Sequence, residues 1–174
     1  MAGHYTARFA ETDADVKSAQ ALRFKTFRGE GDGSDIDAFD PICNHILVEE
    51  SDTGRLVCTF RLLPLANGAE IDKSYSAQFY DLESLHDIKG MIVEMGRFCI
   101  DPTYNDPDIL RVAWSAMTRF VDDNDVELLF GCSSFAGTDS EEYTDAFALL
   151  KERHLAPKCW LPKIKAPKVF QFAR

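Results

Sequence analysis

Hydrophobic side chains recur at helical spacing in three segments of the chain, with polar residues between them. This pattern predicts amphipathic helices over residues 14–29, 109–124 and 141–152. Thr12 or Asp13 is a candidate cap for the first helix, which ends at a glycine. The second has the most regular pattern, because apolar residues recur three and four positions apart along its whole length.

A different pattern, short runs of β-branched, aromatic and aliphatic residues, predicts strands. Residues 45–49 and 55–63 flank the turn at 51–54 and predict an antiparallel hairpin, which Pro64 is expected to end. Residues 77–85 predict a short strand followed by a helical turn.

Two further apolar runs, residues 91–100 and 127–132, predict strands on either side of the middle helix. A strand that returns through a helix to a neighbour is expected to pair with it in parallel. The order of elements describes one α+β domain over residues 1–174 with a mixed sheet.

The central run, residues 91–100, contains two opposite charges, Glu94 and Arg97, among apolar neighbours. Buried charges are rare unless they are paired or catalytic. Residues three apart point to opposite faces of a flat strand, so a direct contact would need a bulge, which Gly96 could allow. From this pattern alone, a buried salt-bridge network is favoured over catalysis.

Charge is distributed unevenly over the 174 residues, whose net charge is −10. Residues 151–174 contain seven Lys and Arg and one acid (7 − 1 = +6), so the rest carries 12 − 28 = −16. This basic segment, kept irregular by three prolines, is either a surface for an anionic partner or membrane face, or a solvated tail. The overall negative charge disfavours nucleic-acid binding. With no leader or membrane-spanning run evident, a cytoplasmic location is expected.

Several kinds of site are not indicated. The chain lacks the glycine-rich motifs of nucleotide-binding enzymes and the G-x-S-x-G motif of α/β-hydrolases. Its five cysteines are scattered without a C-x-x-C pair, so no metal site or disulfide framework is predicted. Cys132 has no evident histidine partner and is interpreted as a core residue rather than a nucleophile. Asp37 and Asp40 could bind a cationic substrate, or form a solvated acidic loop.

Several motifs together resemble the ornithine-acyl-carrier-protein N-acyltransferases, which make the lyso form of bacterial ornithine lipid. The resemblance covers about residues 20–157, and its motifs are Arg23 to Phe27, Asp37-Ala-Phe-Asp40, Cys43-Asn-His45, Thr59-Phe-Arg-Leu-Leu-Pro64, Val93-Glu-Met-Gly-Arg-Phe98, Leu129-Phe-Gly-Cys-Ser-Ser-Phe-Ala-Gly-Thr-Asp139 and His154-Leu-Ala-Pro157. More distantly, the chain resembles the acyl-homoserine lactone synthases. Both belong to the GNAT superfamily, which implies a mostly antiparallel mixed sheet with a splayed central strand and helices on both faces.

The resemblance implies transfer of a 3-hydroxyacyl group from a pantetheine thioester to the amino group of ornithine or a similar amino acid. Glu94 would be the base and Arg97 its catalytic neighbour. Asp37 and Asp40 would bind the cation of the amino acid, while Arg23, Arg61 and Arg97 would order these carboxylates or bind the substrate carboxylate. Phe27 would line the site for the substrates.

On the donor side, the resemblance implies that main-chain groups of Phe98 and Ile100 pair with the pantetheine arm, next to Ser133, Ser134 and Phe135. The superfamily's pyrophosphate loop is replaced by residues 101–110, with three acids and no glycine. Acyl carrier protein is therefore favoured over coenzyme A as donor, and no tightly bound cofactor is expected. The basic segment would meet the acidic carrier protein.

Two alternatives stay open at the level of the sequence. One is an acyl-homoserine lactone synthase. The other is a non-catalytic module that binds acyl groups or carrier protein, because the family usually continues past the Leu-Ala-Pro segment and residues 151–174 are expected to be a shortened version of that region.

Overall fold

The computed structural model describes residues 3–29, 31–135, 137 and 139–171. The helices and strands are, in chain order, β1 (Tyr5–Phe9), α1 (Asp13–Arg28), β2 (Asn44–Glu50), β3 (Leu56–Leu65), β4 (Tyr80–Asp81), β5 (Ile92–Ile100), α2 (Pro107–Asp123), β6 (Leu128–Gly131), α3 (Thr144–Arg153) and β7 (Lys163–Ile164).

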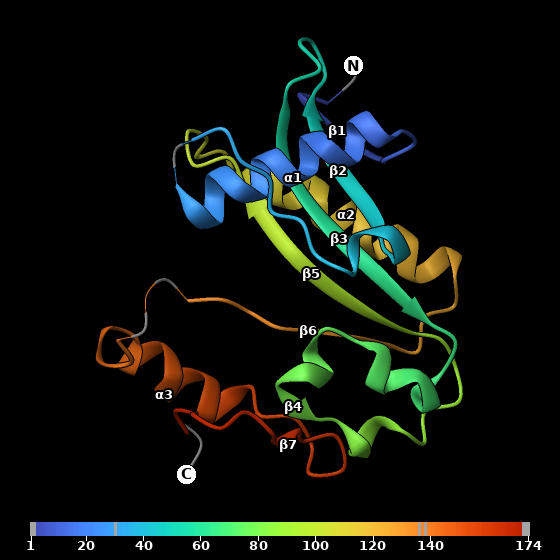
Figure 1. Cartoon of the computed structure of the whole chain (residues 1–174), viewed down its shortest axis with the longest axis vertical. Helices are drawn as coiled ribbons and strands as arrows, with labels where there is room; N and C mark the ends of the chain where they lie inside the picture. Colours follow the sequence, from blue (N-terminus) through green and yellow to red (C-terminus); the bar gives the residue numbers. More distant parts are fainter. Residues whose placement is uncertain (1–2, 30, 136, 138, 172–174) are drawn as a thin grey trace.

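The main sheet has the strand order β1-β2-β3-β5-β6. Its first four strands are antiparallel, and β6 pairs with β5 in parallel after the crossover through α2. Helices α1 and α2 cover opposite faces of this sheet, while α3, β4 and β7 form a smaller part below it (Figure 1). The predicted α+β fold, with a mostly antiparallel mixed sheet and helices on both faces, is confirmed.

The two helices form where their sequences predict them. Helix α1 begins at a capping box in which Thr12 and Asp15 exchange side-chain and backbone hydrogen bonds. Helix α2 turns its regular apolar stripe toward the sheet and buries Ile109, Ala113 and Phe120 in the main core. Amphipathic packing of this kind supplies most of the stability of a helix in a protein.

Three details of the strands were predicted wrongly. Pro64 does not end β3 but lies within it, opposite Val93. Its missing N–H is tolerated because the ladder to β2 ends at Leu62, so Pro64 has a strand on one side only. Strand β1 was missed because only its first residue, Tyr5, is buried and the run shows no clear alternation. The two-residue strand β7 interrupts a segment that was expected to be irregular.

The central strand β5 separates from β6 halfway along its length. Pairing with β6 covers residues 92–95 of β5 and stops at Gly131. This glycine approaches its neighbour closely, because an added Cβ atom would lie 2.2 Å from the carbonyl oxygen of Met95. Beyond this point β5 continues to Ile100 paired with β3 alone, among the described residues. The predicted splayed central strand is therefore present (Figure 1).

Candidate active site

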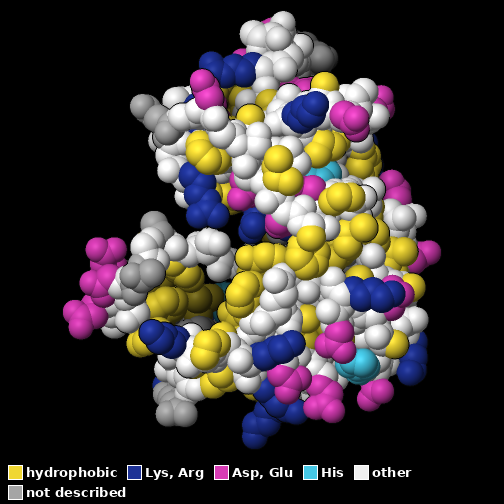
Figure 2. Space-filling view, viewed as in Figure 1, with side chains coloured by type: hydrophobic (Ala, Val, Ile, Leu, Met, Phe, Trp, Pro, Cys, Tyr) yellow, Lys and Arg dark blue, Asp and Glu magenta, His cyan; other side chains and the backbone are white. Residues whose placement is uncertain are grey.

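A cavity of about 1200 Å³ opens where β5 and β6 separate. Charged groups from β3 and β5 line one part of it, and aromatic and aliphatic side chains from α1, α2 and the C-terminal segment line another. Figure 2 shows hydrophobic side chains gathered around this hollow, next to the C-terminal part of the chain. The site-lining residues relevant to the sequence predictions are Phe27, Arg61, Glu94, Arg97, Phe98, Ser133 and Ser134.

Glu94 lies in the cavity wall with only 4% of its surface exposed. Its Oε2 atom accepts a hydrogen bond of 2.6 Å from the Tyr75 N–H, and its Oε1 atom accepts one of 2.7 Å from the Ser76 N–H. The Ser76 hydroxyl also donates to Oε1. These donors come from the start of the short 3₁₀ turn Ser76–Gln78. They fix the carboxylate without a cationic partner in the part of the chain that the structure describes.

Arg97 is placed by a β-bulge. Thr59 pairs with Cys99 and Arg61 pairs with Gly96, so β5 contains one more residue than β3 across this stretch. The predicted bulge is present, but Arg97 rather than Gly96 adopts the left-handed conformation, with φ of 54°. A non-glycine residue with this φ is uncommon and costs free energy, so its surroundings must hold it.

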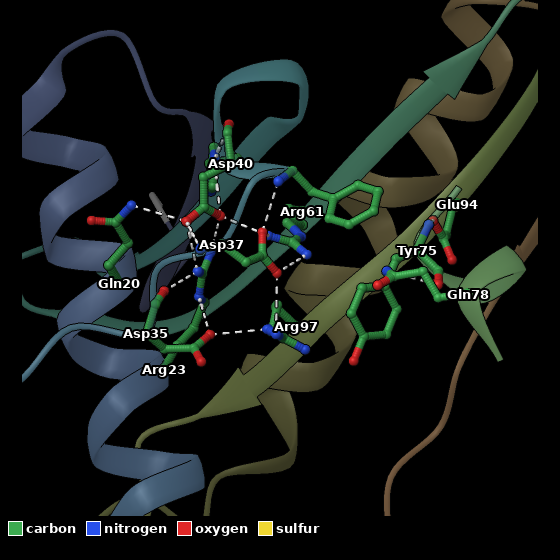
Figure 3. A network of polar contacts seen from close by, with 12 residues as sticks. Gln20, Arg23, Asp35, Asp37, Asp40, Arg61, Tyr75, Gln78, Glu94 and Arg97 are labelled. Carbon is green, nitrogen blue, oxygen red and sulfur yellow. Dashed lines mark hydrogen bonds and ion pairs between the residues drawn. The ribbon is translucent and has the colours of Figure 1, made fainter. Parts of the chain in front are cut away.

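Those surroundings are a network of three arginines and three aspartates between α1, β3 and β5 (Figure 3). Its members are Arg23, Asp35, Asp37, Asp40, Arg61 and Arg97. Each arginine forms ion pairs with two aspartates, with nitrogen–oxygen distances between 2.6 and 3.1 Å. Three positive and three negative groups balance (3 − 3 = 0), which limits the cost of burying them.

The electrostatics of the network keep Asp37 and Asp40 ionised. Burial alone would raise the pKa of Asp37 and Asp40, but the arginines outweigh this effect. Hydrogen bonds and charge from Arg61 lower the pKa of Asp37, and Arg23 does the same for Asp40. Asp40 is buried and Asp37 partly so. The alternative of a solvated acidic loop is therefore wrong for these two residues.

Not every residue proposed from the sequence lines the cavity. Arg23 and Asp40 are enclosed within the network, and Asp37, which is partly exposed, also belongs to the network and not to the cavity lining. Ile100 lies further along β5, opposite Cys58. Phe135 packs on Tyr143 and Phe147 instead of lining the cavity.

The sequence analysis missed several members of the site. Asp35 is the third acid of the network, and three arginines in predicted elements together with three aspartates in one loop were a usable signal. Tyr75 and Ser76 bind Glu94 mainly through backbone N–H groups, which leave no trace in a residue pattern. Cys132 was interpreted as a core residue; it is in fact exposed, lines the cavity and contacts Ser76. It leaves the core because β6 ends one residue earlier, at Gly131.

Comparisons with known proteins agree with this geometry. A family model described as an acetyltransferase (GNAT) domain matches residues 22–115. The L-ornithine N(alpha)-acyltransferase of Rhodobacter capsulatus is 30% identical, over 92% of this chain and 68% of that protein. The chain belongs to the L-ornithine N(alpha)-acyltransferase family, within the GNAT superfamily. The enzyme of the same name from Brucella abortus is 26% identical, over 91% of this chain and 62% of its own length.

Among solved structures, the AHL synthase LasI shares the fold of this family member. Its TM-score is 0.51 at 22% identity, covering 74% of this chain and 72% of that one. This likeness shows the fold alone. The chain spans between 54% and 68% of the length of the curated L-ornithine N(alpha)-acyltransferases that it matches.

Members of this family are N-acyltransferases, and GNAT acyltransferases take their acyl group from a thioester donor. Within the described residues, no cluster of His, Cys, Asp and Glu could hold a metal ion. None of the described helices is long and apolar enough to span a bilayer.

Proposed function

We propose that this family member transfers a 3-hydroxyacyl group from acyl carrier protein to the α-amino group of L-ornithine. The observation that carries the proposal is the meeting of Glu94, Arg97 and an apolar wall in one cavity at the splay of β5 and β6. Amide formation from a thioester needs a base for the ammonium proton, a binding group for the acceptor and room for the acyl chain.

For the acceptor, Arg97 is the group best placed to bind the α-carboxylate. Its side chain remains 23% exposed, whereas those of Arg23 and Arg61 are 1% and 4% exposed. Asp35 and Asp37 hold its guanidinium, and the ring of Tyr75 lies 5.1 Å from it. Arg23 and Arg61 then act as positioning residues.

The acceptor's side-chain ammonium needs a carboxylate. Of the two aspartates proposed from the sequence, the side chain of Asp37 is 22% exposed and that of Asp40 is 4% exposed. We therefore assign the ammonium of ornithine to Asp37. Asp40 binds the same Arg61 and so helps to hold Asp37 in place. Charged partners that are already ordered lose little entropy when the substrate binds.

Glu94 is the proposed base. Its carboxylate is fixed by the Tyr75 and Ser76 N–H groups, so it cannot swing away from the cavity. It would take the ammonium proton directly or through one water molecule. The amine freed in this way attacks the thioester carbonyl.

The donor arm would lie along the outer edge of β5 from Gly96 to Ile100, which β6 leaves unpaired among the described residues. Main-chain groups of Phe98 and Ile100 can bind an extended pantetheine arm as an added strand would. Ser133 and Ser134 face it from the chain after β6. The acyl chain would occupy the apolar wall, which is formed by Phe27, Phe98, Leu110, Trp114, Val169 and Phe170.

The start of α2 favours a carrier protein over coenzyme A. A helix N-terminus can bind a pyrophosphate, but here Asp106 already occupies it, accepting a hydrogen bond of 2.9 Å from the Asp108 N–H. Asp101 and Asp108 also belong to this loop, but each is paired with a cation, Lys25 and Arg111 respectively. The phosphopantetheine arm of an acyl carrier protein has a single phosphate, so its electrostatic repulsion from this acidic loop is smaller than that of coenzyme A. The basic segment 151–174 would meet the acidic carrier protein or, in its place, the inner face of the membrane.

The test is release of free thiol from 3-hydroxyacyl carrier protein, with and without ornithine. Ornithine-dependent release should fall at least about tenfold in Glu94→Gln, a loss of about 1.4 kcal/mol of transition-state stabilisation. Glu11→Gln, at an exposed position before α1, serves as the matched control and should behave like the unmodified chain. No release while carrier protein still binds would favour the binding-module alternative, and a lactone product would favour a homoserine lactone synthase.

A further inference from the structure

The cations that line the cavity differ in their partners. They are Arg28, Arg61, Arg97 and Lys168. Arg61 and Arg97 are each paired with two aspartates of the ionic network. Arg28, by contrast, is exposed and has no ion pair within the part of the chain that the structure describes, and the same holds for Lys168. An unpaired cation in the wall of a cavity is available to an anionic group of a ligand.

Helix α1 carries Arg28 to the free edge of β5. The helix begins beside β1, where Asp15 Oδ1 lies 2.7 Å from Arg8 Nη2. It then crosses the sheet to the end of β5, where Lys25 Nζ lies 2.7 Å from Asp101 Oδ1. Arg28 follows three positions later as the last residue of the helix, on the same side as Lys25. Figure 1 shows this end of α1 projecting beyond β5, away from β3.

The donor arm would run along β5 toward the same place. From Glu94 to Ile100 the strand advances six residues, which is about 20 Å at 3.3 Å a residue. An extended pantetheine arm that pairs with the outer edge of β5, with its thioester beside Glu94, therefore carries its phosphate toward the end of the strand. Because the last turn of α1 adjoins the end of β5, the phosphate arrives on the side of the cavity that Arg28 lines.

A phosphate at the end of β5 needs a binding group other than the start of α2, whose first N–H groups already have an aspartate cap. The nearby cations Lys25 and Arg111 are each paired with an aspartate. Among the described cations on the last turn of α1 and the first turns of α2, Arg28 alone has no ion pair. A guanidinium group can donate two parallel hydrogen bonds to phosphate oxygens.

We propose that Arg28 binds the phosphate of the phosphopantetheine arm and thereby selects donors that carry one. This inference rests on the proposed use of a pantetheine thioester and adds a phosphate site to it. The site lies at the C-terminal end of α1, on the opposite face of the sheet from α2, so it is distinct from a phosphate site at a helix N-terminus. Its positive charge offsets the repulsion that a phosphate meets from a chain with a net charge of −10.

The position of the phosphate determines which kinetic constant it changes. The phosphate lies at the far end of the arm from the carbonyl that reacts beside Glu94, so its contact with Arg28 is the same in the bound substrate and in the transition state. Uniform binding of this kind lowers KM and leaves kcat unchanged. Loss of Arg28 should therefore raise the KM for a phosphorylated donor without slowing the chemical step.

The experiment compares two donors that differ by the phosphate alone, 3-hydroxyacyl-phosphopantetheine and 3-hydroxyacyl-pantetheine, by ornithine-dependent release of free thiol. The unmodified protein should have a KM about tenfold lower for the phosphorylated donor. Arg28→Gln should raise that KM to the value for acyl-pantetheine and leave kcat within twofold for both donors. Arg28→Lys keeps the charge and should recover part of the difference. Lys17→Gln removes the same charge from an exposed position earlier in α1 and should behave like the unmodified protein.

Calorimetric titration with phosphopantetheine, pantetheine and inorganic phosphate tests the site without turnover, because it needs neither an acceptor nor a thioester. Phosphopantetheine should bind about tenfold more tightly than pantetheine to the unmodified protein, and equally tightly to Arg28→Gln. If the preference for phosphopantetheine persists in Arg28→Gln, the phosphate binds elsewhere and the proposal is wrong. Inorganic phosphate that binds as tightly as phosphopantetheine would show a site for a free anion and would also overturn the assignment to the arm.

The outcomes separate this inference from the proposed function. Binding of phosphopantetheine that depends on Arg28, without release of thiol in the presence of ornithine, would support the phosphate site and overturn the proposed acyl transfer. Equal use of both donors by every variant would support the transferase and overturn the phosphate site. If Arg28→Gln raises the KM for ornithine instead, Arg28 binds the carboxylate of the acceptor and the proposal is wrong.

Discussion

At the scale of single residues, the two charges of the central strand have different partners. Arg97 belongs to a balanced ionic network with Asp35 and Asp37. Glu94 has no ion pair within the described part of the chain and is bound by backbone N–H groups of Tyr75 and Ser76. The sequence could indicate that both charges were unusual, because they interrupt an apolar strand. The sequence could not show that Arg97 belongs to a network while Glu94 is a candidate base, because it does not reveal the backbone N–H groups that bind Glu94.

Asp101, at the end of β5, gives a prediction about pH. Burial would raise the pKa of Asp101, but the hydrogen bonds from Lys25 and Thr103 lower it to about 2. Since this is below the unfolded value of 3.8, the carboxylate stabilises the fold above about pH 4 and loses that effect as the pH falls toward 2. Asp101→Asn should therefore lower the free energy of unfolding by about 1–2 kcal/mol at pH 7.

Urea unfolding at pH 7 and pH 3 checks this prediction. The difference between the mutant and the unmodified protein should shrink by about half at pH 3, because Asp101 is then partly protonated in the unfolded state. Asp52→Asn, in the exposed turn between β2 and β3, should change stability little at either pH. An equal loss at both pH values would assign the effect of Asp101→Asn to packing instead of charge.

At the scale of elements, helices and strands with long regular patterns were predictable. Very short strands that depend on pairing with a segment far away in the sequence were not. The stripe of α2 and the apolar run of β5 gave correct elements because each buries a continuous face. Strands β4 and β7 are two residues each and depend on pairing with one another across about eighty positions. The bulge in β5 was predictable from Gly96, but the backbone assigns the left-handed conformation to Arg97, where Asp35 and Asp37 hold the side chain.

Gly131 tests the close approach of β6 to β5. A Cβ atom at this position would lie 2.2 Å from the Met95 carbonyl oxygen, so Gly131→Ala forces the strands apart. Overpacking of this kind costs about 1–3 kcal/mol, which corresponds to a fall in Tm of roughly 2–12 °C for a chain of this length. Gly96→Ala is the matched control on β5, since its nearest contact would be an ordinary 3.8 Å to Arg61. A Tm of Gly131→Ala equal to that of Gly96→Ala would contradict the prediction.

At the scale of the whole molecule, the C-terminal segment belongs to the site. The sequence indicated a basic surface, and the segment does carry exposed lysines. Its apolar residues, however, fold back to line the cavity, among them Ile164, Val169 and Phe170. Lys165 Nζ donates a 2.6 Å hydrogen bond to the Ala77 carbonyl oxygen and so holds the C-terminal segment in this position. Composition alone could suggest a partner for the charges but not this internal role of the neighbouring residues.

The lysines of this segment give a prediction about the donor. Lys158 and Lys168 are exposed on the basic segment, and their replacement by glutamate should weaken the encounter with an acidic carrier protein. We expect the KM for 3-hydroxyacyl carrier protein to rise about tenfold at low salt, with a smaller further increase on adding NaCl than in the unmodified protein. The KM for ornithine should stay unchanged.

Two controls identify the cause of that change. Lys17 is exposed on α1, and Lys17→Glu changes the net charge by half as much as the double replacement of Lys158 and Lys168. This variant should leave the KM for carrier protein near its original value. An acyl-pantetheine donor without the protein should be used equally well by both forms, because only the carrier surface responds to these lysines. If acyl-pantetheine is impaired to the same extent, Lys168 acts within the cavity that it lines, and the carrier protein docks elsewhere. Loss of binding to anionic vesicles, with carrier protein kinetics intact, would assign the segment to a membrane surface instead.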